Sequence, residues 1–231
     1  MAIAQALYEA GASVVVADLN EEALRSVPDQ FGSAARVATL AGDLSREKDA
    51  NALIEFALKT FGHLDILVNN AGGGVILPFL EHTAETLHQT LDRNLWTTLW
   101  CNKAALPAMK ARQYGRIIHI GADSVRNGLW NHAAYNAAKG GVHGLTTGLA
   151  REFAGDGITV NTVAPSAVHT PVLETVQTQK PELAHQFLSV IPMGRAAECS
   201  EVASMVCYLA TEQAAFVTGQ VICVNGGSTM L

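Results

Sequence analysis

At 231 residues, of which 49% are hydrophobic and 16% charged, the chain is long enough to bury a large core, and it fits a single domain spanning residues 1–231. Its net charge of −6 provides no basic surface for nucleic acid or for an anionic membrane, so neither partner is expected. The four cysteines form neither a CxxC pair nor a disulfide framework, which predicts reduced thiols in the cytoplasm. The eight histidines form no HxxxH or Cys/His cluster, so no metal site is predicted.

Short apolar runs rich in β-branched residues alternate along the chain with longer helical patterns. Because these runs are too continuous for half-exposed strands, we interpret them as buried parallel strands. The predicted strands are Ser13–Ala17, Arg36–Leu40, Asp65–Val68, Arg116–Ile120, Ile158–Val163 and Gln220–Val224. The predicted helices cover residues 20–30, 46–61, 84–113 (one long stretch, kinked or broken), 133–154 and 198–211. This alternation without hairpin signals predicts an α/β fold, a Rossmann-like doubly wound parallel sheet with helices on both faces.

Polar and small residues follow the predicted strands where each one ends. They are Asp18, Asp43, Asn69–Gly72, Ser124 and Pro165. In a doubly wound sheet the ligand crevice lies beyond the carboxyl ends of the strands, so we expect these residues to gather at one edge.

Asp18 directly follows the first predicted strand. A carboxylate at this point accepts both hydroxyls of an adenosine ribose and repels the 2′-phosphate of NADP. An isolated Asp in front of a helix is more often a capping or turn residue, and that alternative stays open. Together with the other strand ends, Asp18 favours NAD over NADP. The glycines 72–74 would allow the backbone to approach a flat ligand, although an ordinary loop is the better explanation of a glycine triplet taken by itself.

Tyr135 and Lys139 are the residues with the clearest chemical potential. On a helix, residues four apart lie one above the other, so the ammonium of Lys139 is expected near the Tyr135 hydroxyl. A cation there lowers the phenol pKa from about 10 and prepares the phenolate to take a proton from an alcohol. Ser124, near a strand end, is a candidate to hydrogen-bond the reacting oxygen. A chance pairing and a loop serine are the alternatives.

These motifs, in this order and spacing, resemble the short-chain dehydrogenase/reductase family from Met1 to Gly227. The resemblance rests on Asn69-Asn70-Ala71-Gly72, Asn94, Ser124, Tyr135 with Lys139, Asn161–Pro165, Thr170 and Val224–Gly227. It implies hydride transfer between a secondary alcohol and the nicotinamide of NAD, with a homotetramer as the assembly.

The resemblance also assigns roles to individual residues. The implied catalytic set is Asn94, which positions a proton-relay water, with Ser124, Tyr135 as general base, and Lys139. The implied cofactor set is Asp18, Asp43 and Leu44 beside the adenosine, Asn70, Ala71 and Gly72, Tyr135 and Lys139 at the nicotinamide ribose, and Pro165, Val168 and Thr170 towards the carboxamide.

Three positions depart from the family pattern. The family serine commonly lies thirteen residues before the tyrosine, where this chain has Ala122, and Ser166 replaces a common glycine. Met1 and the residues after it resemble the helix that follows the family's glycine-rich turn, so the first strand and that turn are missing. We therefore expect a fragment whose absent strand would lie between the strands ending at Asp18 and Asn69. A chain that begins at Met1 and has closed the gap is the alternative.

The substrate class is suggested by weaker similarities. The stretches 77–80, 98–101 and 104–107 are most similar to the branch that oxidises cis-dihydrodiols of aromatic acids. Candidate substrate contacts are Trp130, His132, Phe187 and Met193 as walls, and Arg126 or Arg195 as a cation for a carboxylate. The alternatives are a 3-oxoacyl thioester reductase, which would favour NADPH and a basic residue near position 18, and a non-catalytic relative used for binding.

Overall fold

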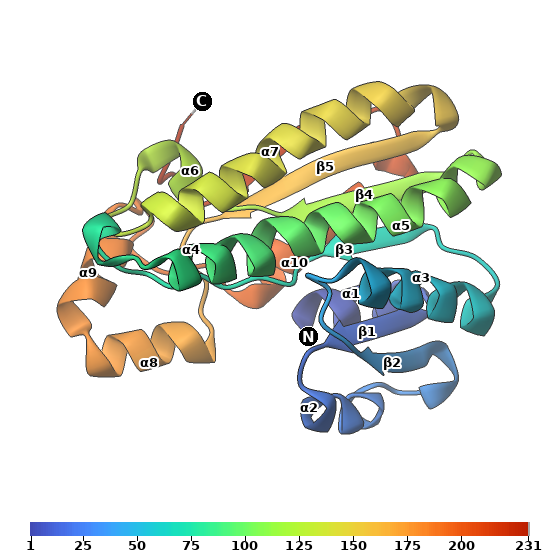
Figure 1. Cartoon of the computed structure of the whole chain (residues 1–231), viewed down its shortest axis with the longest axis horizontal. Coiled ribbons are helices and arrows are strands. Elements are labelled where there is room, and N and C mark those ends of the chain that lie inside the picture. The colour runs from blue at the N-terminus through green and yellow to red at the C-terminus, as the bar shows by residue number, and fades with distance from the viewer. Residues whose placement is uncertain (231) are drawn as a thin grey trace.

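The computed structural model describes residues 1–230 and shows an α/β fold in which every strand pairing is parallel (Figure 1). The strands are β1 Val14–Asp18, β2 Val37–Ala41, β3 Ile66–Asn69, β4 Gly115–Ile120, β5 Ile158–Pro165 and β6 Val221–Val224. The predicted fold class and all six predicted strands are confirmed, with boundaries shifted by one or two residues.

The helices agree less completely with the sequence patterns. They are α1 Ala2–Glu9, α2 Glu21–Arg25, α3 Glu47–Phe61, α4 Ala84–Leu91, α5 Thr97–Arg112, α6 Ser124–Asn127, α7 Ala133–Phe153, α8 Pro171–Gln179, α9 Pro181–Ser189 and α10 Cys199–Leu209. The long stretch 84–113 is divided by a π-helical turn, Asp92–Trp96. The pair α8 and α9 was not predicted, although each begins with a proline at its first position, which is a common helix start.

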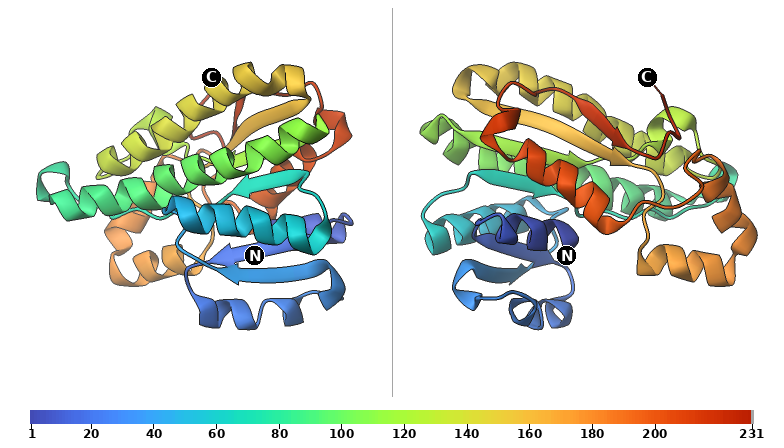
Figure 2. Two further views of the ribbon diagram at one scale, coloured as in Figure 1. Left: turned by 45° about the vertical axis from the view of Figure 1, so that its right-hand side comes forward. Right: turned by 180° about the vertical axis from the view of Figure 1, so that it is seen from behind.

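The helices form two layers around the strands. Helices α3, α5 and α7 cover one face, and α1 and α10 cover the other (Figures 1 and 2). Neighbouring residues of β4 show why both faces are apolar: Ile117 packs with α3 and α5, whereas Ile118 packs with α10. Both side chains are buried, as expected for a strand covered on both faces.

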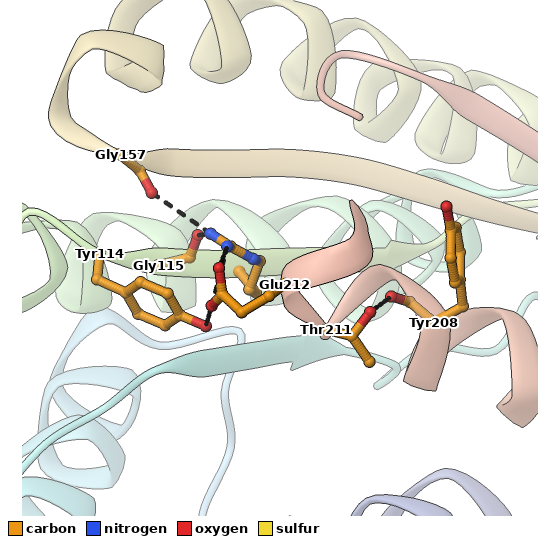
Figure 3. A network of polar contacts seen from close by, with 7 residues as sticks. Tyr114, Gly115, Gly157, Tyr208, Thr211 and Glu212 are labelled. Atoms are coloured by element: carbon orange, nitrogen blue, oxygen red, sulfur yellow. Dashed lines mark hydrogen bonds and ion pairs between the residues drawn. The ribbon is translucent and has the colours of Figure 1, made fainter. Parts of the chain in front are cut away.

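The amino-terminal end of β4 is anchored by a buried arginine. Arg116 is 3% exposed, and its Nη2 lies 3.3 Å from Glu212 Oε2. Its Nη1 donates to the carbonyl oxygens of Gly115 and Gly157. The hydroxyl of Tyr114 points to Glu212 and donates to its Oε1 at 2.9 Å (Figure 3). This network holds the edge of the sheet opposite to the strand ends that carry the candidate site.

The strands of the described chain form two sheets. One has the order β1-β2 and the other β3-β4-β5-β6, so the facing edges of β1 and β3 are unpaired. A cavity of about 1640 Å³ extends between them, lined by residues of both strands and of α1. This is larger than the roughly 300–1,000 Å³ of a small-molecule pocket, so there is room beside a ligand for a further segment. The gap lies between the strand that ends at Asp18 and the strand that ends at Asn69.

A buried polar atom lies at the edge of this gap, and helices connect the two sheets across it. Asn69 Nδ2, at the end of β3, is buried with no hydrogen-bond partner among the described residues. The two sheets are joined through helix contacts, α1 with α10 and α3 with α5. Within residues 1–230, no helix is long and apolar enough to cross a membrane.

A strand placed between β1 and β3 should stabilise the protein, because it would pair two rows of open backbone donors and acceptors. We expect a chain extended upstream of Met1 by about 20–25 residues, one strand and a tight turn, to melt at a higher temperature and to aggregate less than the 231-residue chain. A matched extension with prolines in the strand is the control, since proline cannot donate to the pairing. Equal melting temperatures in all three proteins would contradict the prediction.

Candidate active site

The carboxyl ends of β1, β3 and β5 open onto the same large cavity. Most of the predicted cofactor residues line it: Asp18, Asp43, Leu44, Asn70, Ala71, Gly72, Pro165, Val168 and Thr170. Lys139 is adjacent, because a Cβ added at Gly72 would lie 3.3 Å from its Nζ. The structure thus places residues from distant parts of the sequence around one space, and the first residues of α1 face it as well.

The two carboxylates at the rim of the cavity differ in their surroundings. Asp18 is exposed, and its Oδ1 accepts a hydrogen bond from the backbone N–H of Asn20 at 2.9 Å. Asp43 Oδ1 accepts from the hydroxyl of Ser45 at 2.7 Å, and this bond lowers the pKa of Asp43. Asp43 is therefore engaged within its own turn. Asp18 keeps its second oxygen free of hydrogen bonds to the described residues.

Asn94 fixes the glycine loop that follows β3. It is fully buried in the π-helical turn, a type of irregularity that is frequent at functional sites. Its Nδ2 donates to the carbonyl oxygen of Gly73 at 2.9 Å, and its Oδ1 accepts from the N–H of the same residue at 3.2 Å. A Cβ at Gly72 would lie 2.8 Å from Asn94 Oδ1, which explains the need for glycine there. The side chain thus positions the loop.

Lys139 is the charged centre of the site. The side chain is buried, and Nζ donates to the carbonyl oxygen of Ile120 at the end of β4, at 2.7 Å. Burial lowers the pKa of the ammonium to about 8, so the group is charged at neutral pH and titrates just above it.

Tyr135 lies one helical turn before Lys139 and packs against the glycine loop. A Cβ at Gly74 would lie 2.7 Å from Tyr135 Cδ2, so the ring and the loop are in direct contact. Lys139 Nζ is 5.9 Å from the centroid of the tyrosine ring. The sequence-based expectation of a lowered phenol pKa is wrong for the protein by itself, because burial raises the pKa of Tyr135 to about 12. Desolvation here outweighs the nearby ammonium.

Ser124 follows β4, which ends at Ile120, and begins the short helix α6. Its hydroxyl donates to Asn136 Oδ1 at 2.6 Å, so its single proton is directed to α7. At the position of the family serine, Ala122 is buried, and its backbone N–H donates to His143 Nε2 at 3.4 Å.

Asn136 and His143 were missed from the sequence. His143 is four residues after Lys139 and covers Gly121, where an added Cβ would clash with its ring. Burial lowers the pKa of His143 to about 4, which keeps the ring neutral and able to accept the Ala122 N–H. The i, i+4 spacing from Lys139 was the available signal.

The end of β5 leads to α8 through two of the predicted residues. Thr170 is the N-cap of α8, and its Oγ1 accepts a hydrogen bond from the N–H of Leu173 at 3.3 Å. Val168 forms an isolated parallel bridge with Ala197. Both contacts hold this segment beside the cavity that it lines.

The buried ammonium makes a measurable contribution to the pH dependence of folding. Between pH 8 and 10.5 the unfolded chain retains the Lys139 proton that the native protein has released, so stability should rise with pH in this window. Relative to Lys139→Met, the original protein should gain up to about 1.4 kcal/mol of unfolding free energy per pH unit. Denaturant titrations at several pH values measure this, with the exposed Lys48→Met as the control. Parallel curves for Lys139→Met and the original protein would contradict it.

Comparison with known proteins agrees with the geometry of the site. Residues 1–229 match the family described as Enoyl-(Acyl carrier protein) reductase. The 2,3-dihydroxy-2,3-dihydro-p-cumate dehydrogenase of Pseudomonas putida is 61% identical over 100% of this chain and 90% of its own length. The 3-oxoacyl-(acyl-carrier-protein) reductase of Vibrio cholerae is 34% identical over 100% and 92%. A solved structure titled "ElxO with NADP Bound" has a TM-score of 0.92 at 28% identity and covers 98% of this chain and 92% of that one.

The family match extends over nearly the whole chain, and most of the expected cofactor residues line the cavity at the strand ends. The chain belongs to the short-chain dehydrogenase/reductase family and is an oxidoreductase.

Proposed function

We propose that the protein oxidises a cis-dihydrodiol of an aromatic acid to the corresponding catechol with NAD. The observation that carries this is the 61% identity to a dihydrodiol dehydrogenase, together with a Tyr135–Lys139 pair beside the cavity that Asp18 lines. Loss of a hydride from one carbinol carbon and of its hydroxyl proton gives a hydroxy ketone. Enolisation of this ketone restores the aromatic ring as the catechol, which favours the oxidative direction.

The residues around the cavity fit a dinucleotide. Gly72 and Gly74 keep the loop free of Cβ atoms where a flat ring would approach, and Asp18 has an oxygen available for a ribose hydroxyl. The first residues of α1 line the cavity, and the free N–H groups of a helix N-terminus suit a pyrophosphate. When bound, NAD supplies the hydride acceptor. Asp43, Leu44 and the segment from Pro165 to Thr170 would contact its two ends.

Tyr135 acts as the general base in this proposal. With a pKa near 12 the phenol holds its proton at neutral pH, so the phenolate needs a positive charge in its vicinity. Lys139, charged below its pKa of about 8, supplies that charge from its anchored position on Ile120. Asn94 keeps the glycine loop against the tyrosine ring and positions the proton-relay water. Ser124 contributes through Asn136, its hydrogen-bond partner beside Tyr135.

The carboxylate of the substrate would be met by one of two arginines. Both terminal nitrogens of Arg195 are bound to Glu201, at 2.7 and 2.8 Å. Within residues 1–230, the Arg126 side chain makes one hydrogen bond, from Nη1 to the Sγ of Cys223 at 3.0 Å. Arg126 is therefore the cation that we assign to the carboxylate.

A second candidate function is reduction of a 3-oxoacyl thioester, supported by relatives at 33–34% identity. Asp18 disfavours it, because a carboxylate there repels the 2′-phosphate of NADPH. A non-catalytic relative would not be expected to retain Asn94, Tyr135 and Lys139 in one connected arrangement. Activity with each substrate class and cofactor separates the three.

Assembly and location are also proposed. A homotetramer is supported by large apolar side chains that remain exposed, including Trp96 at 41% and Phe216 fully. The four cysteines are free thiols, as in a cytoplasmic protein. Light scattering after gel filtration measures the mass of the assembly.

Tyr135→Phe should reduce turnover at least about a hundredfold, because it removes the phenolic oxygen and retains the ring that packs on Gly74. NAD affinity should change little. Steady-state kinetics and an NAD titration measure the two quantities. Turnover within a few-fold of the original protein would show that another group takes the proton.

Asp18→Ala should weaken the preference for NAD over NADP, since it removes a ribose partner and the repulsion of a 2′-phosphate. The ratio of kcat/KM values should move towards NADP by about 1–3 kcal/mol. Asp29→Ala is the matched control, because that carboxylate is exposed and does not line the cavity. If the ratio of kcat/KM values for NAD and NADP is unchanged in Asp18→Ala, Asp18 is a turn residue that accepts the Asn20 N–H and does not contact the cofactor.

A further inference from the structure

The residue that begins helix α7 does not cap it. His132 is the N-cap of this helix, and its side chain makes no capping hydrogen bond. Ser, Thr, Asp and Asn are the residues that stabilise this position, because their side chains accept a hydrogen bond from a free N–H of the first turn. A histidine at the start of the helix that carries Tyr135 and Lys139 is therefore not explained by helix stability.

The ring of His132 lies between Tyr135 and the helix pair that follows β5. It is 8% exposed and packs edge-to-face on Tyr135, with ring centroids 5.8 Å apart and planes at 82°. On its other side Phe187 of α9 packs in the same manner, at 5.2 Å and 83°. Figure 1 shows α9 beside the beginning of α7. His132 thus contacts both the proposed base, Tyr135, and helix α9.

The hydrogen bonding of the ring determines its tautomer. Nδ1 lies 2.7 Å from the carbonyl oxygen of Trp130, which can only accept, so Nδ1 carries the proton. Burial lowers the pKa of His132, which keeps the ring neutral. Nε2 then has a lone pair and no proton, and it makes no hydrogen bond within residues 1–230. It is not one of the fully buried polar atoms that lack a partner, so a ligand can reach it.

An imidazole in this state recognises a donor and discriminates against an acceptor. A hydroxyl can donate to Nε2, whereas a carboxylate or a ketone oxygen cannot. A site that hydrogen-bonds a substrate hydroxyl disfavours the analogue without it, because a polar group is then left unpaired.

We propose that Nε2 of His132 accepts a hydrogen bond from the second hydroxyl of a vicinal diol while Tyr135 acts on the first. This assignment rests on the proposed function and specifies it further: it makes His132 the residue that selects diols over mono-alcohols. A 3-oxoacyl thioester offers no hydroxyl for this contact.

The test compares a cis-dihydrodiol with the mono-alcohol that lacks its second hydroxyl. His132→Phe retains an aromatic ring between Tyr135 and Phe187 but removes the nitrogen acceptor. Its kcat/KM for the diol, relative to the mono-alcohol, should fall about three- to tenfold, the scale of one neutral hydrogen bond, mostly through KM. His132→Gln, whose amide oxygen can accept, should recover part of the loss. His185→Phe, the same replacement at an exposed histidine of α9, is the matched control.

The outcomes separate this inference from the function on which it rests. Diol oxidation by the unaltered protein tests the function alone, and its absence would overturn both. If His132→Phe oxidises the diol as well as the original protein does, or loses activity equally on diol and mono-alcohol, His132 has only a packing role and the function stands. Melting temperature and NAD affinity of each variant show that the fold is retained.

Discussion

A buried ammonium group sets the arrangement of the whole site. Lys139 is 4% exposed, and a charge in such surroundings is tolerated only with a strong partner, which is the carbonyl oxygen of Ile120 at 2.7 Å. That bond ties α7 to the end of β4. Because Tyr135 lies one turn earlier on the same helix, its ring is placed against Gly74, and Asn94 hydrogen-bonds the adjoining Gly73. The Lys139–Ile120 hydrogen bond thus positions α7, and α7 and Asn94 together position the glycine loop.

The residues that line the cavity come from two separate sheets, so a ligand bound there would also stabilise the fold. Asp18 and Asp43 belong to the half built on β1 and β2, whereas Tyr135, Lys139 and Thr170 belong to the half built on β3 to β6. The halves are connected by helix packing and not by strand pairing. A dinucleotide that contacts both halves binds only when they are correctly placed, so its binding energy adds directly to the stability of the fold.

The sequence predicted the strands well because continuous β-branched runs have few other stable arrangements in a parallel sheet. It also predicted the Tyr135–Lys139 pair, which follows from helix geometry alone. It did not predict the hydrogen bond from Asn94 to Gly73 or that from Ser124 to Asn136, since both join residues distant in sequence. The direction of the Tyr135 pKa was wrong because charge pairing is visible in a sequence and desolvation is not.

We propose that this arrangement of residues oxidises a cis-dihydrodiol with NAD. The proposed reaction is measured most directly by NADH absorbance on mixing the protein with NAD and a cis-dihydrodiol of an aromatic acid, with the catechol product quantified in the same sample. We expect NADH and catechol in equal amounts, and much less NADPH when NADP replaces NAD. No NADH from any dihydrodiol, with NADPH consumed on a 3-oxoacyl thioester, would contradict the proposed reaction.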